Sequence, residues 1–264
     1  MILSDHGDRT RREVITVGST GLVTGVAGCS GAIPEDIAQR GRSENADTEP
    51  PELADFSDAE LDRARSLGKE VREAVAVIRG ENGEGGTAWF LDSGRLLTNS
   101  HVVGSSEGFE AWSINGDKFE PELVGASDYR NSPYHDVAVL ETDFSPSNRL
   151  PLGESDAVEK EQPVVQIGHP FGIGNWVVSI GRYVESGHGE TLLTSVPSLS
   201  GNSGGPLLTL DGSVVGITTG SVPRKQLDST QPEPVDLEVH EEFTDYEWTT
   251  HDATSVISRY VEKY

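Results

Sequence analysis

The stretch GNSGGPL at residues 201–207 sets one serine among glycines and runs into a short apolar strand. A serine hydroxyl attacks a carbonyl only when a base takes its proton. Glycines beside it let the backbone bend tightly and turn N–H groups inward, where they can bind the oxyanion of a tetrahedral intermediate. Ser203 is therefore a candidate nucleophile, and the amides of Gly201 and Ser203 are candidate oxyanion donors. A glycine-rich hairpin whose serine caps a turn is the alternative for this stretch alone.

Two other stretches can supply a base and an acid. In LLTNSHVV (residues 96–103) an apolar strand ends near His101, and in HDVAVL (residues 135–140) Asp136 directly precedes a strand that should be buried. A carboxylate at such an edge can accept the imidazole Nδ1–H and fix the tautomer of the ring. Singly, His101 could be a surface or core histidine and Asp136 a turn residue. Together, in the order His, Asp, Ser, the three predict a catalytic triad.

Short strands with turn residues between them surround these stretches. We expect strands at 75–78, 87–91, 95–98, 109–114, 119–125, 137–141, 164–167, 176–184, 191–195, 206–210 and 213–218. Many short strands with little helix indicate a β-sandwich or β-barrel. Ser57 and Glu60 have the spacing of a capping box, which predicts a helix over about 57–73. Apolar residues at helical spacing predict a second helix over about 253–264.

The three stretches together resemble the trypsin-like (chymotrypsin-fold) serine proteases, most closely the HtrA/Deg branch. That family places its histidine in Leu-Thr-Asn-x-His-Val-Val, its aspartate in Asp-hydrophobic-Ala-Val-Leu and its serine in Gly-Asn-Ser-Gly-Gly-Pro-Leu, matched here by residues 97–103, 136–140 and 201–207. Residues 168–172 (GHPFG) resemble its Gly-x-Pro-x-Gly turn. The resemblance covers about residues 74–222. It implies an all-β fold of two six-stranded antiparallel β-barrels, the first over about 74–142 and the second over about 164–250, within one protease domain over 57–264.

The resemblance also implies a serine endopeptidase that hydrolyses peptide bonds of extracellular or misfolded proteins through an acyl-enzyme, without a metal or organic cofactor. A chaperone-like binding protein on a protease scaffold, and an esterase using the same triad, remain alternatives. Asn202 stands where activated trypsin zymogens have Asp, so no buried ion pair with a new N-terminus is expected. The chain ends soon after the protease domain, so we expect no PDZ domain of the kind many HtrA proteins carry.

The substrate pocket of this family is lined by the segment before the nucleophile and by a later strand. The matching candidates here are Pro197, Leu199, Thr219 and Ser221. No acid lies at the expected base of the pocket. A trypsin-like preference for Arg or Lys is therefore not expected, and small or medium apolar P1 residues are.

The first 29 residues have the features of an export signal. Arg11 and Arg12 precede a mildly apolar stretch too short to span a bilayer, and small residues lead to Cys29. The paired arginines resemble a twin-arginine signal, and VAGC (residues 26–29) resembles a lipobox. An ordinary signal cut nearby is the alternative. We expect a secreted protein held on the outer face of the membrane by a lipid on Cys29, with residues 30–56 as an acidic flexible tether.

The charge of the chain excludes some partners. The sequence has 44 acidic and 20 basic residues, a formal net charge of -24. Nucleic-acid binding needs clustered Lys and Arg, and an anionic bilayer would repel this chain, so a lipid anchor is the only membrane contact expected. A very soluble acidic protein and a protein from a high-salt cell both fit. We favour the second, because the Debye length is about 3 Å at 1 M salt and self-repulsion is then screened.

Overall fold

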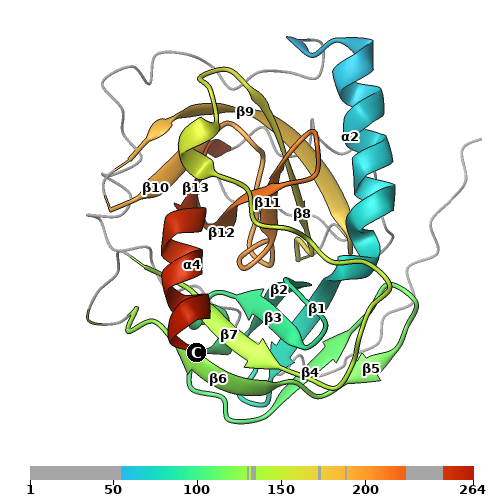
Figure 1. The fold of residues 1–264 in the computed structure, drawn as a ribbon, viewed down its shortest axis with the longest axis vertical. Helices are drawn as coiled ribbons and strands as arrows, with labels where there is room; N and C mark the ends of the chain where they lie inside the picture. Colours follow the sequence, from blue (N-terminus) through green and yellow to red (C-terminus); the bar gives the residue numbers. More distant parts are fainter. Residues whose placement is uncertain (1–54, 130, 132–134, 172–173, 188, 224–245) are drawn as a thin grey trace, which may run out of the picture.

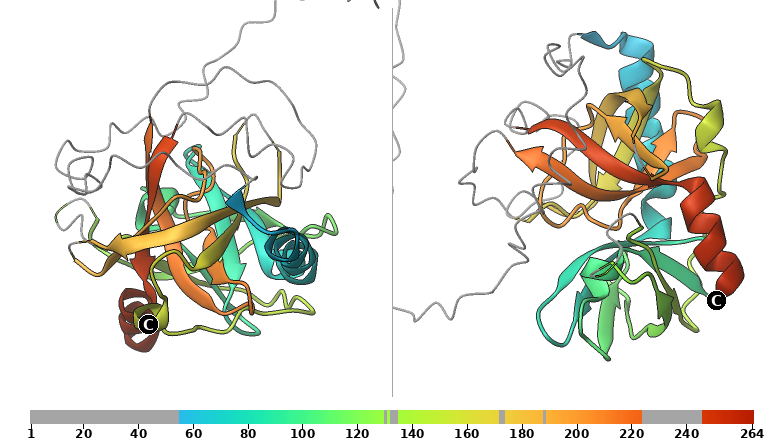
Figure 2. Two further views of the ribbon diagram at one scale, coloured as in Figure 1. Left: turned by 90° about the horizontal axis from the view of Figure 1, so that it is seen from above. Right: turned by 90° about the vertical axis from the view of Figure 1, so that its left-hand side faces the viewer.

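The computed structural model describes residues 55–129, 131, 135–171, 174–187, 189–223 and 246–264. The expected signal, Cys29, nearly all of the tether and most of an acidic segment at 228–247 lie outside the described residues. Two β-structures are stacked along the long axis of the molecule (Figure 1), and a side view separates them clearly (Figure 2).

The first β-structure is an antiparallel sheet of seven strands, in the order β5-β4-β1-β2-β3-β7-β6. Its strands are β1 (Val75–Gly80), β2 (Gly85–Phe90), β3 (Arg95–Thr98), β4 (Phe109–Trp112), β5 (Lys118–Phe119), β6 (Glu122–Ala126) and β7 (Ala138–Glu141). Each strand is short because a turn follows it closely, as with the Asp92-Ser93-Gly94 turn between β2 and β3. The register pairs Thr98 with Ala138, which brings the end of β3 beside the start of β7.

The second β-structure is a closed barrel, in the order β10-β13-β12-β11-β8-β9. Its strands are β8 (Pro163–Gly168), β9 (Val177–Ser186), β10 (Thr191–Thr194), β11 (Pro206–Thr209), β12 (Val214–Pro223) and β13 (Tyr246–Ala253). The strand β13 closes the barrel by pairing with both β10 and β12. No strand was expected over the residues of β13.

The all-β fold with a chymotrypsin-like pair of β-structures is confirmed, with one difference. The first structure is an open sheet of seven strands rather than a closed barrel of six. Where one strand was expected over 119–125, the chain forms β5 and β6. Pro121, which lies between them, has no N–H to donate to a ladder and so interrupts the pairing.

Three α-helices and two short 3₁₀ helices complete the described structure: α2 (Asp58–Val71), α3 (Ser100–Val103), α4 (Thr254–Lys263), η2 (Arg72–Ala74) and η3 (Ser155–Ala157). The predicted N-terminal and C-terminal helices are thus confirmed. The capping box of α2 is formed, because Ser57 Oγ accepts the Glu60 amide at 3.3 Å and the Glu60 carboxylate accepts the Ser57 amide at 2.7 Å.

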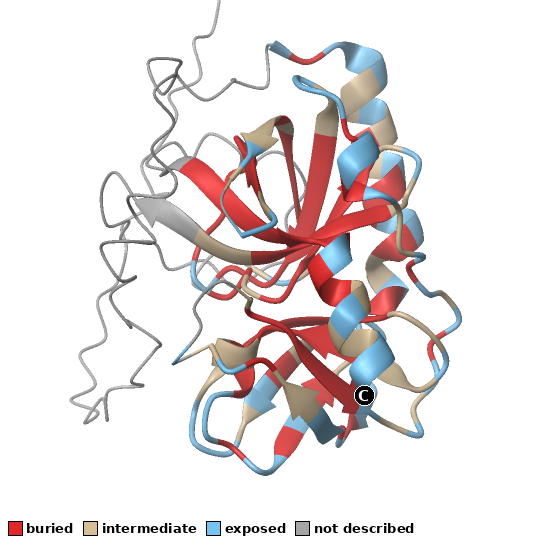
Figure 3. Cartoon of the chain, turned by 60° about the vertical axis from the view of Figure 1, so that its left-hand side comes forward, coloured by how far each residue is buried: buried red, intermediate tan, exposed pale blue. Residues whose placement is uncertain are grey.

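The helices α2 and α4 pack on the β-structures and help to join them. Helix α2 packs on β8 and β9 of the barrel, whereas α4 contacts β12, β13 and also β7 of the sheet (Figure 1). One hydrophobic cluster includes Leu67 of α2, Leu97 of the sheet, Ile167 of the barrel and Ile257 of α4. Figure 3 shows buried residues in the strands of both β-structures. The core therefore extends across the junction and holds the two β-structures in a fixed relation.

Candidate active site

His101 and Asp136 meet where the end of β3 lies beside the start of β7. His101 lies in α3, one short turn after β3, and Asp136 lies two residues before β7. The His101 amide donates to Asp136 Oδ1 at 2.9 Å, and the ring Nδ1–H donates to Asp136 Oδ2. Asn99 adds a hydrogen bond from its side-chain amide to the Asp136 carbonyl. Both carboxylate oxygens therefore hold His101, which leaves Nε2 as the basic atom of the ring.

The electrostatic environment raises the pKa of His101 above its ordinary value of 6.5. Burial alone would lower that pKa, but the charge of Asp136 and the hydrogen bond to it outweigh burial. The Asp136 side chain is only 2% exposed, so its charge is poorly screened by water. The pair is arranged to stabilise an imidazolium, which is the state a general base reaches after taking a proton.

A second buried carboxyl group, that of Asp252, supports Asp136 from the barrel. The Asp136 amide donates to Asp252 Oδ2 at 2.6 Å, and Asp252 is 3% exposed near the end of β13. Burial raises the pKa of Asp252 well above its ordinary value. Sequence reasoning missed this residue. An Asp just before a predicted helix is typical of a cap, yet the N-cap position of α4 is Ala253 and lacks a side-chain hydrogen bond.

Ser203 lies in a tight turn between barrel segments. Gly201 and Gly204 have φ angles of +100° and +83°, a region that residues with a side chain rarely adopt. A Cβ at Gly204 would lie 2.2 Å from the Thr87 carbonyl oxygen, and one at Gly201 would lie 2.2 Å from the His169 carbonyl oxygen. The glycines predicted to shape this turn are therefore required by both backbone conformation and space.

The amides of the turn divide into bonded and free groups. The Asn202, Gly204 and Gly205 amides donate to the carbonyls of Leu199, Thr218 and Asn202, at 2.9–3.0 Å. Within the described residues, no hydrogen bond leaves the amide of Gly201 or Ser203. These are the two amides predicted to bind an oxyanion. They can receive a developing negative charge without first breaking a bond.

The orientation of the Gly201 amide is set by its neighbour. The Ser200 carbonyl accepts the Phe171 amide at 2.8 Å. In a trans peptide the C=O and the following N–H point in opposite directions. The Gly201 N–H therefore points away from Phe171. The hydrogen bond from Phe171 thus sets the direction of one of the two candidate donors.

The nucleophile turn and the histidine segment pack against the same glycine. A Cβ at Gly86 would lie 2.7 Å from the Ser203 carbonyl oxygen and 3.0 Å from Val102 Cγ2, next to His101. In the described part of the chain, Ser203 Oγ makes no hydrogen bond to the His101 ring. Such bonds are often long in substrate-free sites and tighten when substrate binds.

The four candidate pocket residues lie on the two expected segments. Pro197 and Leu199 precede the nucleophile and are buried, whereas Thr219 in β12 donates its hydroxyl to the Thr250 carbonyl at 3.1 Å. Ser221 also belongs to β12. Their assignment as a substrate pocket stays a prediction.

A buried polar layer lies behind the nucleophile turn and was not foreseen. Thr218, whose carbonyl holds the Gly204 amide, receives a hydrogen bond from Gln166 Nε2 at 2.6 Å. Its hydroxyl also lies 3.1 Å from His251 Nδ1. Burial lowers the pKa of His251 to about 3, so the ring is neutral at physiological pH. This layer fixes the strand against which the turn is held.

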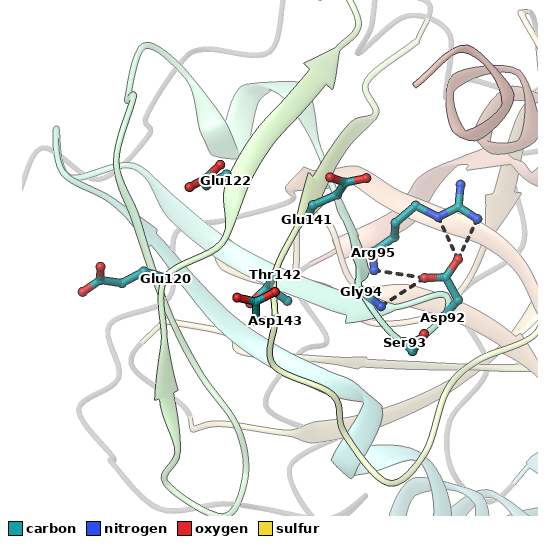
Figure 4. A pocket seen from close by; sticks show the side chains of 9 residues that line it. All are labelled: Asp92, Ser93, Gly94, Arg95, Glu120, Glu122, Glu141, Thr142 and Asp143. Atoms are coloured by element: carbon teal, nitrogen blue, oxygen red, sulfur yellow. Dashed lines mark hydrogen bonds and ion pairs between the residues drawn. The ribbon is translucent and has the colours of Figure 1, made fainter.

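A hollow of about 550 Å³ lies elsewhere, on the sheet (Figure 4). It is lined by Asp92, Ser93, Gly94, Arg95, Glu120, Glu122, Glu141, Thr142 and Asp143. Arg95 is paired with Asp92 at 2.6 Å. None of the triad candidates lines this hollow, so its position is separate from the candidate active site.

Candidate metal clusters and membrane-spanning helices are both absent from the described residues. In this part of the chain, no group of three or more His, Cys, Asp or Glu side chains is placed to hold a metal ion. Over the same residues, no helix has the length and apolar character needed to cross a bilayer.

Comparison with known proteins connects this geometry to a family. Residues 86–217 match the model of the trypsin-like peptidase domain. A probable periplasmic serine endoprotease DegP-like of Pseudomonas fluorescens is 32% identical over 178 residues, which is 64% of this chain and 35% of that protein. The periplasmic serine endoprotease DegP of Escherichia coli K12 is 31% identical over 137 residues, 48% of this chain and 28% of that protein.

Solved structures share the fold. The inactive form of the Rv3671c protease of M. tuberculosis superposes with a TM-score of 0.60 at 21% identity, covering 82% of this chain and 97% of that one. The chain spans about a third of the length of the curated relatives it matches. The family model covers half of the chain, from β2 of the sheet to β12 of the barrel. The chain therefore belongs to the trypsin-like peptidase family, on its HtrA/Deg branch.

Proposed function

We propose that this protein is a serine endopeptidase in which Ser203 is the nucleophile, His101 the general base and Asp136 the orienting acid. The observation that carries the proposal is the pairing of a carboxylate-held imidazole with a serine turn whose two free amides are the expected oxyanion donors. The names of the relatives, which are serine endoproteases, support the same reaction class.

The proposed reaction proceeds by acyl transfer. Ser203 Oγ attacks the peptide carbonyl as His101 Nε2 takes its proton, and Asp136 stabilises the imidazolium. The Gly201 and Ser203 amides bind the oxyanion, and His101 then protonates the leaving amine. Water attacks the acyl-enzyme with His101 again as base, which releases the acid product and restores Ser203.

A fluorophosphonate probe tests the nucleophile, because it forms an O–P bond with an activated serine as fluoride leaves. We expect the wild-type chain to be labelled and to hydrolyse casein. Ser203→Ala should abolish labelling and lower turnover at least a thousandfold, whereas Ser145→Ala at an exposed position should change neither. A loss of less than tenfold in Ser203→Ala would remove Ser203 from the role.

Among the described residues Ser203 Oγ has no hydrogen bond to His101, and this observation also fits an alternative, a chaperone-like protein whose triad is rarely aligned. This protein would bind unfolded polypeptide without labelling or turnover. An esterase would be labelled and would cleave ester but not peptide substrates. Measuring labelling, casein turnover and ester turnover on one preparation separates the three activities.

We also propose that the protein is exported and anchored by a lipid on Cys29. The paired arginines and the lipobox-like VAGC support this location, as do relatives named as periplasmic. Mass spectrometry of the mature N-terminus tests it: a lipid-modified Cys29 as first residue is the expected result. An unmodified terminus upstream of Cys29 would rule the anchor out.

The charge of -24 supports a further proposal, that the protein works at high salt. Screening removes much of the repulsion among its carboxylates, so the free energy of unfolding should rise with salt. Unfolding in KCl from about 0.1 M to 2 M measures this. Equal stability throughout would count against a high-salt habitat.

A further inference from the structure

Thr87 of the sheet holds the nucleophile turn of the barrel. It lies in β2 and is fully buried. Its backbone amide donates to the Ser203 carbonyl at 2.9 Å, and its hydroxyl donates to the Gly201 carbonyl at 2.8 Å. One residue of the first β-structure thus binds the carbonyls on both sides of Asn202.

The hydroxyl of Thr87 is used to its full capacity. A threonine hydroxyl has one hydrogen to donate and two lone pairs. The hydrogen goes to Gly201, and the oxygen accepts the His169 amide at 3.1 Å. His169 Nδ1 lies 3.0 Å from the same oxygen, so that ring nitrogen must carry its proton and donate it. His169 is therefore held in one tautomer, and the Gly-His-Pro-Phe segment is tied to the turn.

These bonds determine the direction of each peptide in the turn. The carbonyls of Ser200 and Asn202 accept the amides of Phe171 and Gly205, at 2.8 and 2.9 Å. With the two carbonyls bound by Thr87, all four carbonyls from 200 to 203 are hydrogen-bonded. Among the amides of residues 201 to 205, those of Gly201 and Ser203 have no hydrogen-bond acceptor in the described part of the chain and are left to face an oxyanion.

A turn of this composition needs an outside restraint. Gly201 has no Cβ and can occupy several φ and ψ regions, so the peptide after it can rotate at low cost. The Thr87 hydroxyl opposes this rotation, because a rotated peptide would leave the buried hydroxyl and the Gly201 carbonyl unpaired.

We propose that the Thr87 hydroxyl is a positioning group that keeps the oxyanion-binding turn formed before substrate arrives. Thr87 does not touch the substrate and acts through Gly201 and His169. The proposal rests on the proposed peptidase function, because it concerns the same turn. It also implies that the turn needs no activating ligand to reach its catalytic shape.

Three substitutions separate the hydroxyl from the rest of the side chain. Thr87→Val keeps the shape and the backbone bond to Ser203 but lacks the hydroxyl. Thr87→Ser keeps the hydroxyl and should therefore restore kcat and the labelling rate. Thr209→Val is the matched control, since Thr209 is a buried threonine whose hydroxyl, among the described residues, bonds within its own hairpin, to Asp211 and the Ser213 carbonyl.

The measurements are kcat and KM for a peptide substrate and the rate of fluorophosphonate labelling, all scaled to folded protein by circular dichroism. Removing a direct oxyanion donor costs about a hundred- to a thousandfold in kcat. An indirect effect should be smaller, so Thr87→Val should lower kcat and the labelling rate about ten- to a hundredfold, with KM changed less than threefold. The kcat and labelling rate of Thr87→Ser should lie within threefold of the wild-type values, and those of Thr209→Val should equal the wild-type values.

Each outcome decides the matter. If Thr87→Val folds and keeps the wild-type kcat, whether or not its KM changes, the positioning role is wrong. If Thr87→Val does not fold, Thr87→Ala, which leaves room at the site and keeps the backbone bond, takes its place with the same expected loss. A loss in Thr87→Ser equal to that in Thr87→Val would also overturn the role. If the wild-type chain itself is neither labelled nor active, the proposed peptidase function fails, which is a different result from an active Thr87→Val.

Discussion

Replacing Asp252 by asparagine should stabilise the folded protein, and the gain should grow as the pH rises. Asp252 is 3% exposed and accepts the Asp136 amide at 2.6 Å. Burial raises its pKa, and the charges of Asp136 and Glu190 raise it further, against the opposing effects of the Asp136 hydrogen bond and of Arg259. The folded chain therefore keeps the Asp252 proton at pH values where the unfolded chain has lost it.

The sign follows from proton counting. Above the ordinary Asp pKa of 3.8 and below the raised one, the folded state binds more protons than the unfolded state. The free energy of unfolding then falls as the pH rises, by up to about 1.4 kcal/mol per pH unit for this one group. Asparagine has no proton to lose and keeps an amide oxygen for the Asp136 N–H. The stability difference between Asp252→Asn and wild type should therefore increase at that slope above pH 3.8 and level off above the raised pKa.

Denaturant unfolding at pH 4.5, 5.5 and 6.5 measures this difference, with both chains carrying Ser203→Ala to prevent self-digestion. Asp156→Asn, at an exposed position, controls for the loss of one negative charge. Asp252→Ala leaves the buried Asp136 N–H without a partner and should cost about 1–3 kcal/mol. A stability difference for Asp252→Asn that stays constant with pH, or that moves in favour of aspartate, would refute the reasoning.

Two further predictions concern the histidine and the core. Because Asp136 raises the pKa of His101, the acid limb of kcat/KM should have its midpoint above pH 6.5. The substitution Asp136→Asn should move that midpoint to lower pH and reduce kcat by several orders of magnitude. A pH–rate profile whose midpoint does not move in Asp136→Asn would contradict this prediction. Leu97→Ala, in the core shared by sheet and barrel, should cost about 2–5 kcal/mol in denaturant unfolding, whereas Leu123→Ala, at a side chain 39% exposed, should cost less than about 1 kcal/mol. Equal costs would contradict the assignment of Leu97 to that core.

The sequence can single out the candidate residues because each lies in a contiguous stretch with its own local chemistry. An apolar strand leads to His101, Asp136 precedes a buried strand, and Ser203 sits among glycines whose positive φ angles the turn requires. The N-terminal helix is equally local, since its capping box needs only Ser57 and Glu60.

The strand β13 shows where local pattern fails. Its residues, YEWTTHDA, contain two acids and a histidine, follow an acidic segment and do not alternate as a half-buried strand would. Two partners, β10 and β12, make it a strand by pairing with both of its edges. His251 is buried against Thr194 and Thr218 of neighbouring barrel strands, and Asp252 is buried against Asp136 of the sheet. No window of eight residues can reveal either environment. Tertiary pairing has overridden local preference.

The supporting contacts could not be predicted for a related reason. Thr87 and Gly201 are 114 positions apart, and Asp136 and Asp252 are 116 apart. Neither pair has a motif, because a threonine in a strand and an aspartate before a helix are both common. Only the docking of the two β-structures brings them together.

These two contacts run in opposite directions across the junction. The sheet contributes Thr87 to the turn that carries Ser203, and the barrel contributes Asp252 to the segment that carries Asp136. Each β-structure therefore holds part of the candidate machinery of the other. Helix α4 begins at Thr254, two residues after Asp252, and contacts β7. It therefore stabilises the junction on the side where Asp136 lies. A shift of one β-structure against the other would disturb both the position of Asp136 and the shape of the oxyanion turn. The alignment of Ser203 with His101 is therefore a property of the junction rather than of either half.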